Sequence, residues 1–245
     1  MATMDMKDSF DRSSKITSPR NQADAWMGDV QRSRLSGFAK LRAIFWRRSL
    51  RLYEAWTLRR LPWVKSLRKE LRREFSSVDP DDTSRLTERA DIFGETPILT
   101  VVKLLELAER HAAVRTFWDL GSGRGTTCLA AAHCGWRATG IEKEADWVRR
   151  AERIARRRDL TASFVCADFA QVEWPREALL FVVATAFSSE LRHFILGRVR
   201  ALEPGSLLVA GDWVGIEQLE LLWQGSLPVD WGVIPFSIYR VGTAT

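Results

Sequence analysis

Cysteine and histidine are scarce in this chain of 245 residues, which has three of each. Three cysteines are too few, and odd in number, to form a disulfide framework, so we expect small core cysteines and a reducing compartment. The histidines are scattered at His111, His133 and His193, which excludes a histidine-rich metal site. No apolar run reaches the roughly 18 residues of a membrane span, and the N-terminus is polar and mixed in charge rather than a secretory signal. These absences predict a cytoplasmic protein without a bound metal.

Apolar and positively charged side chains are plentiful. Hydrophobic residues make up 46% and charged residues 28% of the chain, which predicts a folded core and excludes a wholly disordered protein. Lys and Arg outnumber Asp and Glu by 37 to 31, giving a formal net charge of +6. The length suggests one large domain, or one domain with an appendage.

The composition divides the chain into three parts. Residues 1–31 are polar without a period, and we interpret them as a flexible tail. Residues 32–90 are dense in Arg, with apolar residues at helical spacing. Pro62 interrupts that pattern, so we expect a second short helix from about Trp63 to Phe75, then a linker ending in helix caps at Asp82 and Thr83. The rest, residues 91–245, has the texture of one domain.

That domain alternates apolar strand-like runs with helical runs, and the fourth strand-like run covers residues 178–187. This alternation indicates βαβ units and a mainly parallel sheet. Two β-rich runs around turn residues close the chain and predict an antiparallel hairpin. We therefore expect an α/β fold with a C-terminal antiparallel hairpin, plus an N-terminal helical appendage.

A glycine-rich turn, DLGSGRG at residues 119–125, follows the first of these strands. Its glycines let the backbone turn tightly and approach a ligand closely. The spacing G-x-G-x-G differs from the G-x-G-x-x-G of dinucleotide enzymes, whose loop accepts a pyrophosphate at a helix N-terminus. Asp119 in front of the loop would repel a pyrophosphate, so the combination favours a ligand that carries positive charge.

Two more acids follow the next two strands. Glu142 ends the second strand, roughly 20 residues beyond the loop, where a carboxylate can accept the ribose hydroxyls of an adenosine ligand. Asp168 ends the third, where it can accept from an adenine amino group while Phe169 covers the ring. Carboxyl ends of successive parallel strands meet in one crevice. Alone, each feature has a plainer interpretation as a tight turn, a solvated strand end or a helix cap.

In this order and spacing, the chain from about Phe93 to the C-terminus resembles the class I S-adenosylmethionine-dependent methyltransferases. Residues 119–125 are similar to the first motif of that family, Glu142 to its ribose-binding acid, and Asp168-Phe169 to its adenine-binding pair. The resemblance implies a seven-stranded Rossmann-like sheet and S-adenosylmethionine as cofactor. The cofactor-binding residues that it implies are Glu95, Thr96, Asp119, Gly121, Ser122, Gly123, Gly125, Glu142, Asp168 and Phe169.

A closer likeness is to the non-SET histone-lysine methyltransferases, the disruptor-of-telomeric-silencing type. Phe93-Gly94-Glu95-Thr96 is similar to their Y-G-E-T loop, which closes over the cofactor. Residues 181–193 resemble their F-V-N-N-F-A-F-x-x-E segment, and residues 222–225 a Trp-containing strand. Where those enzymes have paired Asn this chain has Val183 and Ala184, with Thr185 in place of the first Phe. The likeness therefore carries over the cofactor site and leaves the acceptor open.

These features predict an enzyme that transfers a methyl group in line to a nitrogen, either of a lysine-like protein side chain or of a small-molecule amine. Glu95, Thr185 and Glu190 are polar candidates near the crevice mouth, but none is assigned as a catalytic residue. Glu95 is favoured as a cofactor contact and Glu190 as a helix N-terminal charge. One alternative is a catalytically degenerate module recruited to a membrane or to nucleic acid by the basic N-terminal helices. A nicotinamide-dependent reductase is a third possibility, which the glycine spacing and Asp119 oppose.

The basic, aromatic stretch of residues 32–73 has three open interpretations. It can be a helical cap packed on the core, with Arg and Lys stems covering apolar surface. It can be an interfacial helix that makes the protein peripheral to an anionic membrane, or a surface for nucleic-acid phosphates. A second basic cluster, six arginines between positions 149 and 158, is expected to be a solvated helix face. The oligomeric state stays open.

Overall fold

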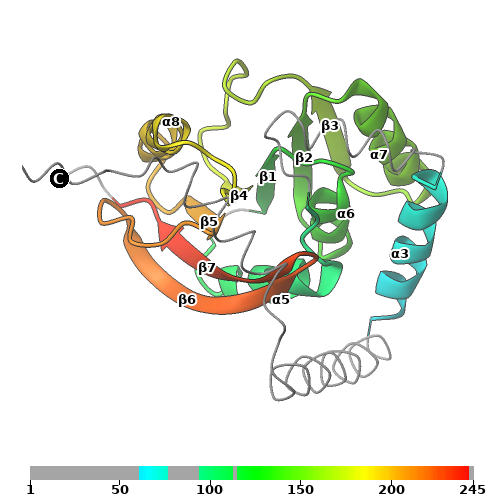
Figure 1. Cartoon of the computed structure of the whole chain (residues 1–245), viewed down its shortest axis with the longest axis horizontal. Coiled ribbons are helices and arrows are strands. Elements are labelled where there is room, and N and C mark those ends of the chain that lie inside the picture. Colours follow the sequence, from blue (N-terminus) through cyan, green and yellow to red (C-terminus); the bar gives the residue numbers. More distant parts are fainter. Residues whose placement is uncertain (1–60, 77–93, 113–114, 243–245) are drawn as a thin grey trace, which may run out of the picture. The chain divides into compact units, whose positions relative to one another are not determined.

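The computed structural model describes residues 61–76, 94–112 and 115–242, all within one compact unit, Glu54–Thr245 (Figure 1). The predicted tail, the first basic helix and the linker with caps at Asp82 and Thr83 lie outside the described residues, as does Phe93. The two boundaries between the three predicted parts therefore stay predictions.

A seven-stranded sheet forms the centre of the fold, in the order β3-β2-β1-β4-β5-β7-β6. The five parallel strands are β1 (Thr116–Leu120), β2 (Arg137–Glu142), β3 (Ala162–Cys166), β4 (Leu179–Val183) and β5 (Leu207–Gly211). The hairpin of β6 (Glu220–Val229) and β7 (Gly232–Arg240) is antiparallel, and β7 also pairs antiparallel with β5. The predicted Rossmann-like α/β fold with a closing antiparallel hairpin is confirmed.

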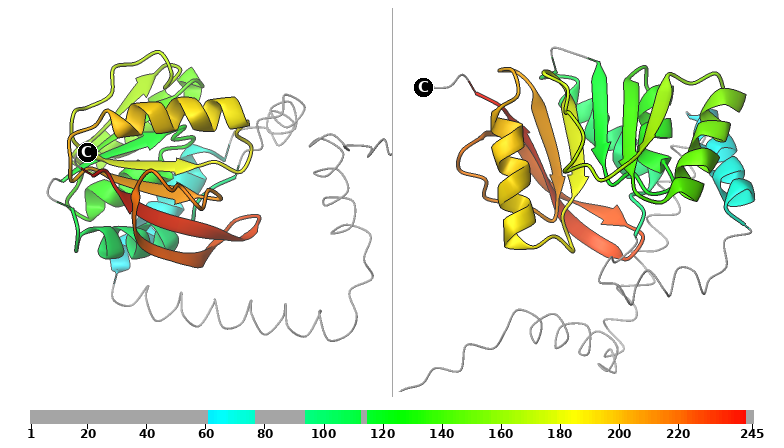
Figure 2. Two further views of the ribbon diagram at one scale, coloured as in Figure 1. Left: turned by 90° about the vertical axis from the view of Figure 1, so that its left-hand side faces the viewer. Right: turned by 90° about the horizontal axis from the view of Figure 1, so that it is seen from above.

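Helices cover the two faces of the sheet unequally (Figure 2). One face shares its apolar core with α3 (Pro62–Glu74), α5 (Ile98–Ala108), α6 (Thr126–His133) and α7 (Ala145–Arg157). The other packs against α8 (Ser189–Arg200) and the loops after β3 and β5. Along β4, Leu179 and Phe181 enter the first core and Leu180 and Val182 the second. Because β4 is covered on both faces, its sequence is apolar at every position.

The helix expected from about Trp63 to Phe75 is present as α3. It starts at Pro62, which suits the first helical position because no N–H is needed there. Val64, Leu67 and Leu71, spaced at three and four residues, are buried against the domain. For this part of the basic region, the interpretation as a helical cap on the core matches the structure.

The arginine cluster of α7 is the predicted solvated face only in part: Arg149 and Arg156 are exposed, but other members bind α3. Arg153 and Arg157 form ion pairs with Glu74 on α3, at 2.8 and 2.6 Å. Arg157 and Arg158 form ion pairs with Glu70, at 2.8 and 3.0 Å. The pattern of α7 alone could not show this, because both acids belong to a distant segment of the chain.

Two further expectations need correction. The fourth strand ends at Val183, earlier than predicted, and the next residues form a turn. Cys128 is buried and Cys134 half-buried, but Cys166 is exposed, so the prediction of a core residue is wrong there. Cys166 ends β3, which is an edge strand with one side open to solvent. Within the described ranges, no helix has the length and apolar character that crossing a bilayer requires.

Candidate functional site

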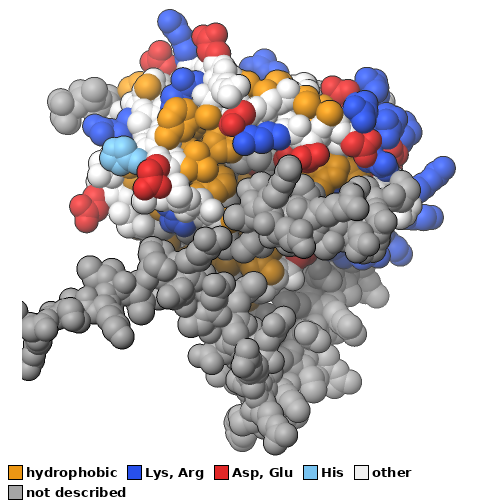
Figure 3. Space-filling view, turned by 45° about the horizontal axis from the view of Figure 1, so that its top comes forward, with side chains coloured by type: hydrophobic (Ala, Val, Ile, Leu, Met, Phe, Trp, Pro, Cys, Tyr) orange, Lys and Arg blue, Asp and Glu red, His pale blue; other side chains and the backbone are white. Residues whose placement is uncertain are grey.

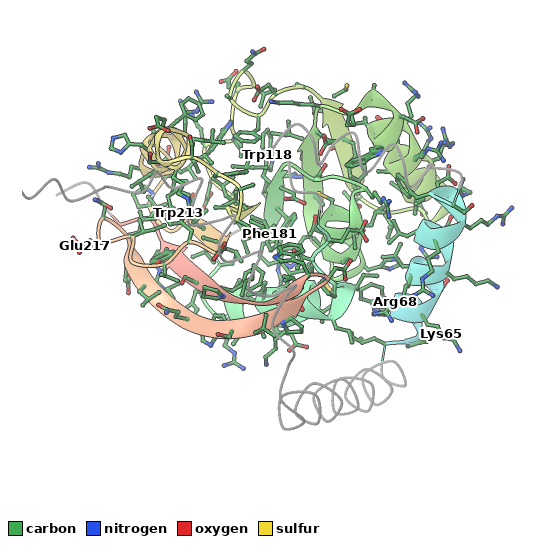
Figure 4. The ribbon with its side chains drawn as sticks, in the orientation of Figure 1. Lys65, Arg68, Trp118, Phe181, Trp213 and Glu217 are labelled. Atoms are coloured by element: carbon green, nitrogen blue, oxygen red, sulfur yellow. The ribbon has the colours of Figure 1, made fainter. Side chains whose placement is uncertain are left out.

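A cleft of about 420 Å³ lies at the carboxyl ends of the parallel strands. It is bounded by residues that follow β1, β2, β3 and β4, by the segment before α5, and by the tip of the β6–β7 hairpin. Phe181 of β4, labelled in Figure 4, also lines it. Its volume falls in the range of small-molecule sites, and its place is where open parallel sheets bind ligands.

Most of the predicted cofactor-binding residues meet in this cleft. Those that line it are Glu95, Thr96, Asp119, Gly121, Ser122, Gly123, Glu142, Asp168 and Phe169. Gly125 does not line it. A Cβ atom at Gly125 would lie 2.6 Å from Phe164 and 2.8 Å from Ala151. The absence of a side chain there serves the packing of the start of α6.

The glycine loop is held in a tight turn against β2. The N–H groups of Gly121 and Ser122 both donate to the carbonyl of Ile141, at 3.0 and 2.9 Å. Gly121 has a φ of +87°, a left-handed conformation that side chains resist. Space beside its Cα is open, since nothing lies within 4 Å of a Cβ built there. The loop thus presents bare backbone to the cleft.

Asp119 is a buried carboxyl group at the end of β1, with 3% of its surface exposed. Burial raises its pKa to about 7, a hydrogen bond from the Thr127 hydroxyl acts against this rise, and the nearby Glu142 charge adds to it. Near neutral pH the group is therefore partly protonated. A positively charged ligand in the cleft would favour the ionised form.

Glu142 is fixed by backbone donors. Its carboxylate accepts from the N–H groups of Gly123, Lys143 and Glu144, at 2.8, 2.7 and 3.1 Å. Each carboxylate oxygen has two acceptor positions, so the Oε2 atom that binds Gly123 keeps one for a ligand. The side chain is thereby oriented before any ligand arrives, and it can accept from a diol.

Asp168 and Phe169 follow β3. Asp168 accepts from the N–H of Ala170 at 2.9 Å and lies 3.1 Å from Lys143 Nζ. The Ala170 hydrogen bond and the Lys143 ammonium hold the pKa of Asp168 below its ordinary value, although burial acts to raise it. No helix follows, among the described residues, before β4, so Asp168 is not a helix cap. The Phe169 ring stacks on that of Phe187, with centroids 6.0 Å apart.

The segment before α5 closes one side of the cleft. Thr126 Oγ1 lies 3.4 Å from Glu95 Oε1, and the Arg124 guanidinium lies 3.9 Å from it. Burial raises the pKa of Glu95; the Arg124 charge opposes this rise and the Asp230 charge adds to it. The Trp231 ring lies against Gly94, where a Cβ atom would come within 2.1 Å of it. The hairpin tip and this segment therefore pack together beside the cleft.

The three polar residues that the sequence suggests for the mouth of the cleft differ in where they lie. Thr185 and Glu95 line the cleft, whereas Glu190 does not. Glu190 is exposed in the first turn of α8, which begins at the N-cap Ser188. This position agrees with its interpretation as a helix N-terminal charge.

Sequence reasoning missed several side chains of the cleft, namely Arg124, Lys143, Phe187 and Trp231. Arg124 had one visible signal, since it stands between two glycines of a ligand-facing loop. Trp231 had another, because a large apolar residue is unusual at a hairpin turn, where polar residues are typical. Lys143 and Phe187 had no such signal.

The residues of the cleft fit S-adenosylmethionine. Asp119, Glu142 and Asp168 all line the cleft, and their carboxyl groups are acceptors of the kind that the ammonium, ribose hydroxyl and adenine amino groups of that cofactor would need. Within the described residues, the buried Ser122 Oγ in the cleft wall has no hydrogen-bond partner and is available to a ligand. In the described ranges, no group of three or more His, Cys, Asp or Glu is placed to hold a metal ion.

Comparisons with known proteins agree with this architecture. Residues 117–205 match a family described as a methyltransferase domain. An RNA methyltransferase from Salinibacter ruber, in complex with S-adenosyl-L-homocysteine, has a similar structure (TM-score 0.51, 21% identity, 62% of this chain and 95% of that one covered). Magnesium protoporphyrin IX methyltransferase from Synechocystis PCC 6803, with bound cofactor, is also similar (TM-score 0.50, 11% identity, 75% and 95% covered). No curated protein matches the chain.

At these identities the structural likenesses establish the fold, and the domain match adds the chemistry. None of these findings selects the histone-lysine type. Together, the sheet order, the three strand-end acids and the match over residues 117–205 show a methyltransferase domain with a Rossmann-like fold, whose cleft residues fit S-adenosylmethionine.

Proposed function

We propose that this methyltransferase acts on an amine nitrogen, either of a lysine-like protein side chain or of a small molecule. Asp168 and Phe169 would hold the adenine, Glu142 the ribose, and Asp119 the ammonium of the cofactor. These roles leave one part of the cleft wall unassigned, the part formed by the turn after β4 and by the tip of the β6–β7 hairpin. The methyl acceptor then meets this remaining wall.

The character of that wall carries the proposal. Phe187 and Trp231 give it aromatic surface, and Trp231 is 40% exposed at its edge. Aromatic faces attract ammonium and methylammonium groups, and they also suit the apolar stem of a lysine. Thr185 Oγ1 is buried in the same wall and, within the described residues, has no hydrogen-bond partner. Its hydroxyl can accept from an acceptor N–H.

The bound cofactor supplies an activated methyl group on a good leaving group. The chain orients the two reactants and excludes water from them, which is what an in-line displacement mainly requires. An acceptor amine must lose a proton to expose its lone pair. Glu95 lines the cleft and has its pKa raised by burial, so its carboxylate is suited to hold that proton.

A transfer assay with labelled cofactor tests the proposal, with unmethylated proteins and small amines offered in parallel. Thr185→Val and Trp231→Ala should each lower the rate about tenfold, while cofactor affinity stays within about twofold. Val233→Ala is the matched control, because Val233 is exposed on the same hairpin and does not line the cleft. Transfer only to oxygen or sulfur acceptors would overturn the amine proposal. Binding of the cofactor without any transfer would favour the degenerate module.

We propose in addition that α3 binds an anionic partner through its outward face. Its four outward cations, Lys65, Lys69, Arg72 and Arg73, are exposed, whereas its two acids pair with α7. Blue side chains gather at this end of the domain in Figure 3, and Lys65 is labelled in Figure 4.

Nucleic acid suits this face better than a membrane. The described part of α3 shows no fully exposed aromatic side chain, because Trp63 stacks on His133 with ring centroids 4.4 Å apart. An interfacial helix needs aromatic or apolar residues to insert, whereas phosphates need only cations. Reversing the four charges to Glu should abolish salt-dependent binding of RNA by the full chain. Unchanged RNA binding, or binding to anionic vesicles alone, would contradict this.

A further inference from the structure

We infer that α3 completes the cofactor site: Phe75, the residue that directly follows α3, holds Arg124 in place to bind the carboxylate of the methionyl group. This inference rests on the cofactor and is independent of the acceptor. It gives the N-terminal appendage a direct part in cofactor binding.

Arg124 is the side chain that lies between the cleft and the residue that follows α3. It belongs to the glycine loop and lines the cleft, and 26% of its side chain is exposed. On one side, its Nε lies 3.9 Å from Glu95 Oε1, at the outer limit of an ion pair. On another, its guanidinium carbon lies 5.4 Å from the centre of the Phe75 ring. Phe75 follows α3 directly and is 5% exposed.

The charges in the cleft select the carboxylate as the partner of Arg124. S-adenosylmethionine carries a single anionic group, the carboxylate of its methionyl end. Among the described residues that line the cleft, Arg124 and Lys143 are the only Lys or Arg side chains. Lys143 pairs with Asp168, at the end assigned to the adenine. Arg124 belongs to the glycine loop, which is assigned to the methionyl end, so it is the cation placed near that carboxylate.

The contact with Phe75 suits such a role. An aromatic face fixes the plane of a guanidinium group without neutralising its charge. The N–H groups at the edge of that plane then stay oriented for a bidentate contact with a carboxylate. The ring is also approached by Arg150, whose guanidinium carbon lies 5.8 Å from its centre. Arg150 does not line the cleft, so it serves the seam between α3 and α7.

The ion pairs between α3 and α7, which we call the seam, hold Phe75 in place in turn. Glu74, the residue before it, pairs with Arg153 and Arg157 of α7. A shift of α3 would therefore move Phe75, and with it Arg124 in the cleft. Because linkage is reciprocal, a cofactor with its carboxylate stabilises the seating of α3, and a displaced α3 weakens cofactor binding.

Two ligands that differ only in the carboxylate test this directly. The full chain is titrated calorimetrically with S-adenosylmethionine and with its decarboxylated form. The wild-type protein should bind the first at least about tenfold more tightly. Arg124→Met should reduce this preference to within about twofold, and Phe75→Leu should reduce it in part. Each ratio is measured on one variant, so a general loss of stability affects both ligands alike.

The controls are matched in kind. Arg156→Met removes a guanidinium that pairs with Glu152 within α7 and does not line the cleft, and Phe194→Leu removes an exposed ring from α8. Both should keep the wild-type preference. An unchanged preference in Arg124→Met, or equal binding of the two ligands by the wild-type protein, would overturn the carboxylate assignment. An unchanged preference in Phe75→Leu alone would overturn the role of α3. If neither ligand bound the folded wild-type protein, the cofactor assignment itself would fail, which is a separate result.

Discussion

The backbone N–H of Gly123 donates a hydrogen bond of 2.8 Å to the carboxylate of Glu142, which joins the glycine loop after β1 to the end of β2. The residue assigned to the ribose and the loop assigned to the methionyl end are thus parts of one arrangement. Such preorganisation lowers the entropy lost when a ligand binds. The consequences of this arrangement can be measured one residue at a time.

Asp119 makes the ligand-free protein sensitive to pH. Burial raises its pKa from the ordinary 3.8 to about 7, so the folded state holds a proton that the unfolded state has released between these values. The free energy of unfolding should therefore fall as pH rises from about 4 to about 7, and then level off. Asp119→Asn should remove this fall and be more stable than the wild-type protein at pH of about 8. Chemical unfolding across this range checks it, and a wild-type curve parallel to that of the variant would count against it.

Cofactor binding should release the same proton. A cationic ligand favours the ionised carboxylate, so at neutral pH about half a proton should leave Asp119 on binding. Calorimetry in buffers of different ionisation enthalpy measures this release. In Asp119→Asn the release should vanish and the affinity should fall about tenfold. Proton release that persists in the variant would assign it to another group.

The two outer glycines of the loop should differ in their effect on stability. Gly121 and Gly125 both have positive φ values, +87° and +78°, so an alanine at either is strained by about 1 kcal/mol. At Gly125 the new Cβ would also press on Phe164 and Ala151, which should bring the total to about 3 kcal/mol. Unfolding midpoints of Gly121→Ala and Gly125→Ala compare the two. Equal losses would show that the packing at the start of α6 is not as described.

The seam between α3 and α7 should depend on Glu74. Burial favours its protonated form, but hydrogen bonds from Arg157 and Arg153 outweigh this and lower its pKa. Its contribution to stability is thus present above the ordinary pKa of 4.5 and is lost as pH falls through the lowered value. At neutral pH, Glu74→Gln should destabilise the protein by about 2 kcal/mol.

Glu152→Gln is the control for this change. Glu152 pairs with Arg156 within α7, where the two side chains are 37% and 71% exposed, so its loss should alter stability by less than about 0.5 kcal/mol. Chemical unfolding of both variants at neutral pH makes the comparison. Similar, small effects for both would mean that the ion pairs between α3 and α7 contribute no more than surface pairs.

The sequence predicts the sheet and the acid positions well, for a physical reason. Strand and helix periods are local, and parallel strands bring their carboxyl ends to one edge, so Glu142 and Asp168 had to converge with Asp119. Contacts between segments that are distant in the sequence leave no such periodic pattern in it. The pairing of Glu70 and Glu74 with the arginines of α7 is of this kind, and it was missed.

The same limit applies to the cleft. The residues taken from local motifs lie in it, except Gly125, whose requirement is packing. The contacts of Arg124 with Phe75 and of Trp231 with Gly94 join distant segments of the chain, so no local pattern predicts them. The acceptor wall depends on the placement of a hairpin tip, which no local pattern specifies.

The most direct test of the account is a calorimetric titration of the full chain with S-adenosylhomocysteine, repeated on Glu142→Ala and on Glu217→Ala. Glu217 is exposed and does not line the cleft, so it serves as the control. We expect binding with a dissociation constant of about micromolar order for the wild-type protein and for Glu217→Ala, and a loss of at least about tenfold in Glu142→Ala. Absence of binding to the folded wild-type protein, or equal binding by all three, would contradict the proposed cofactor site.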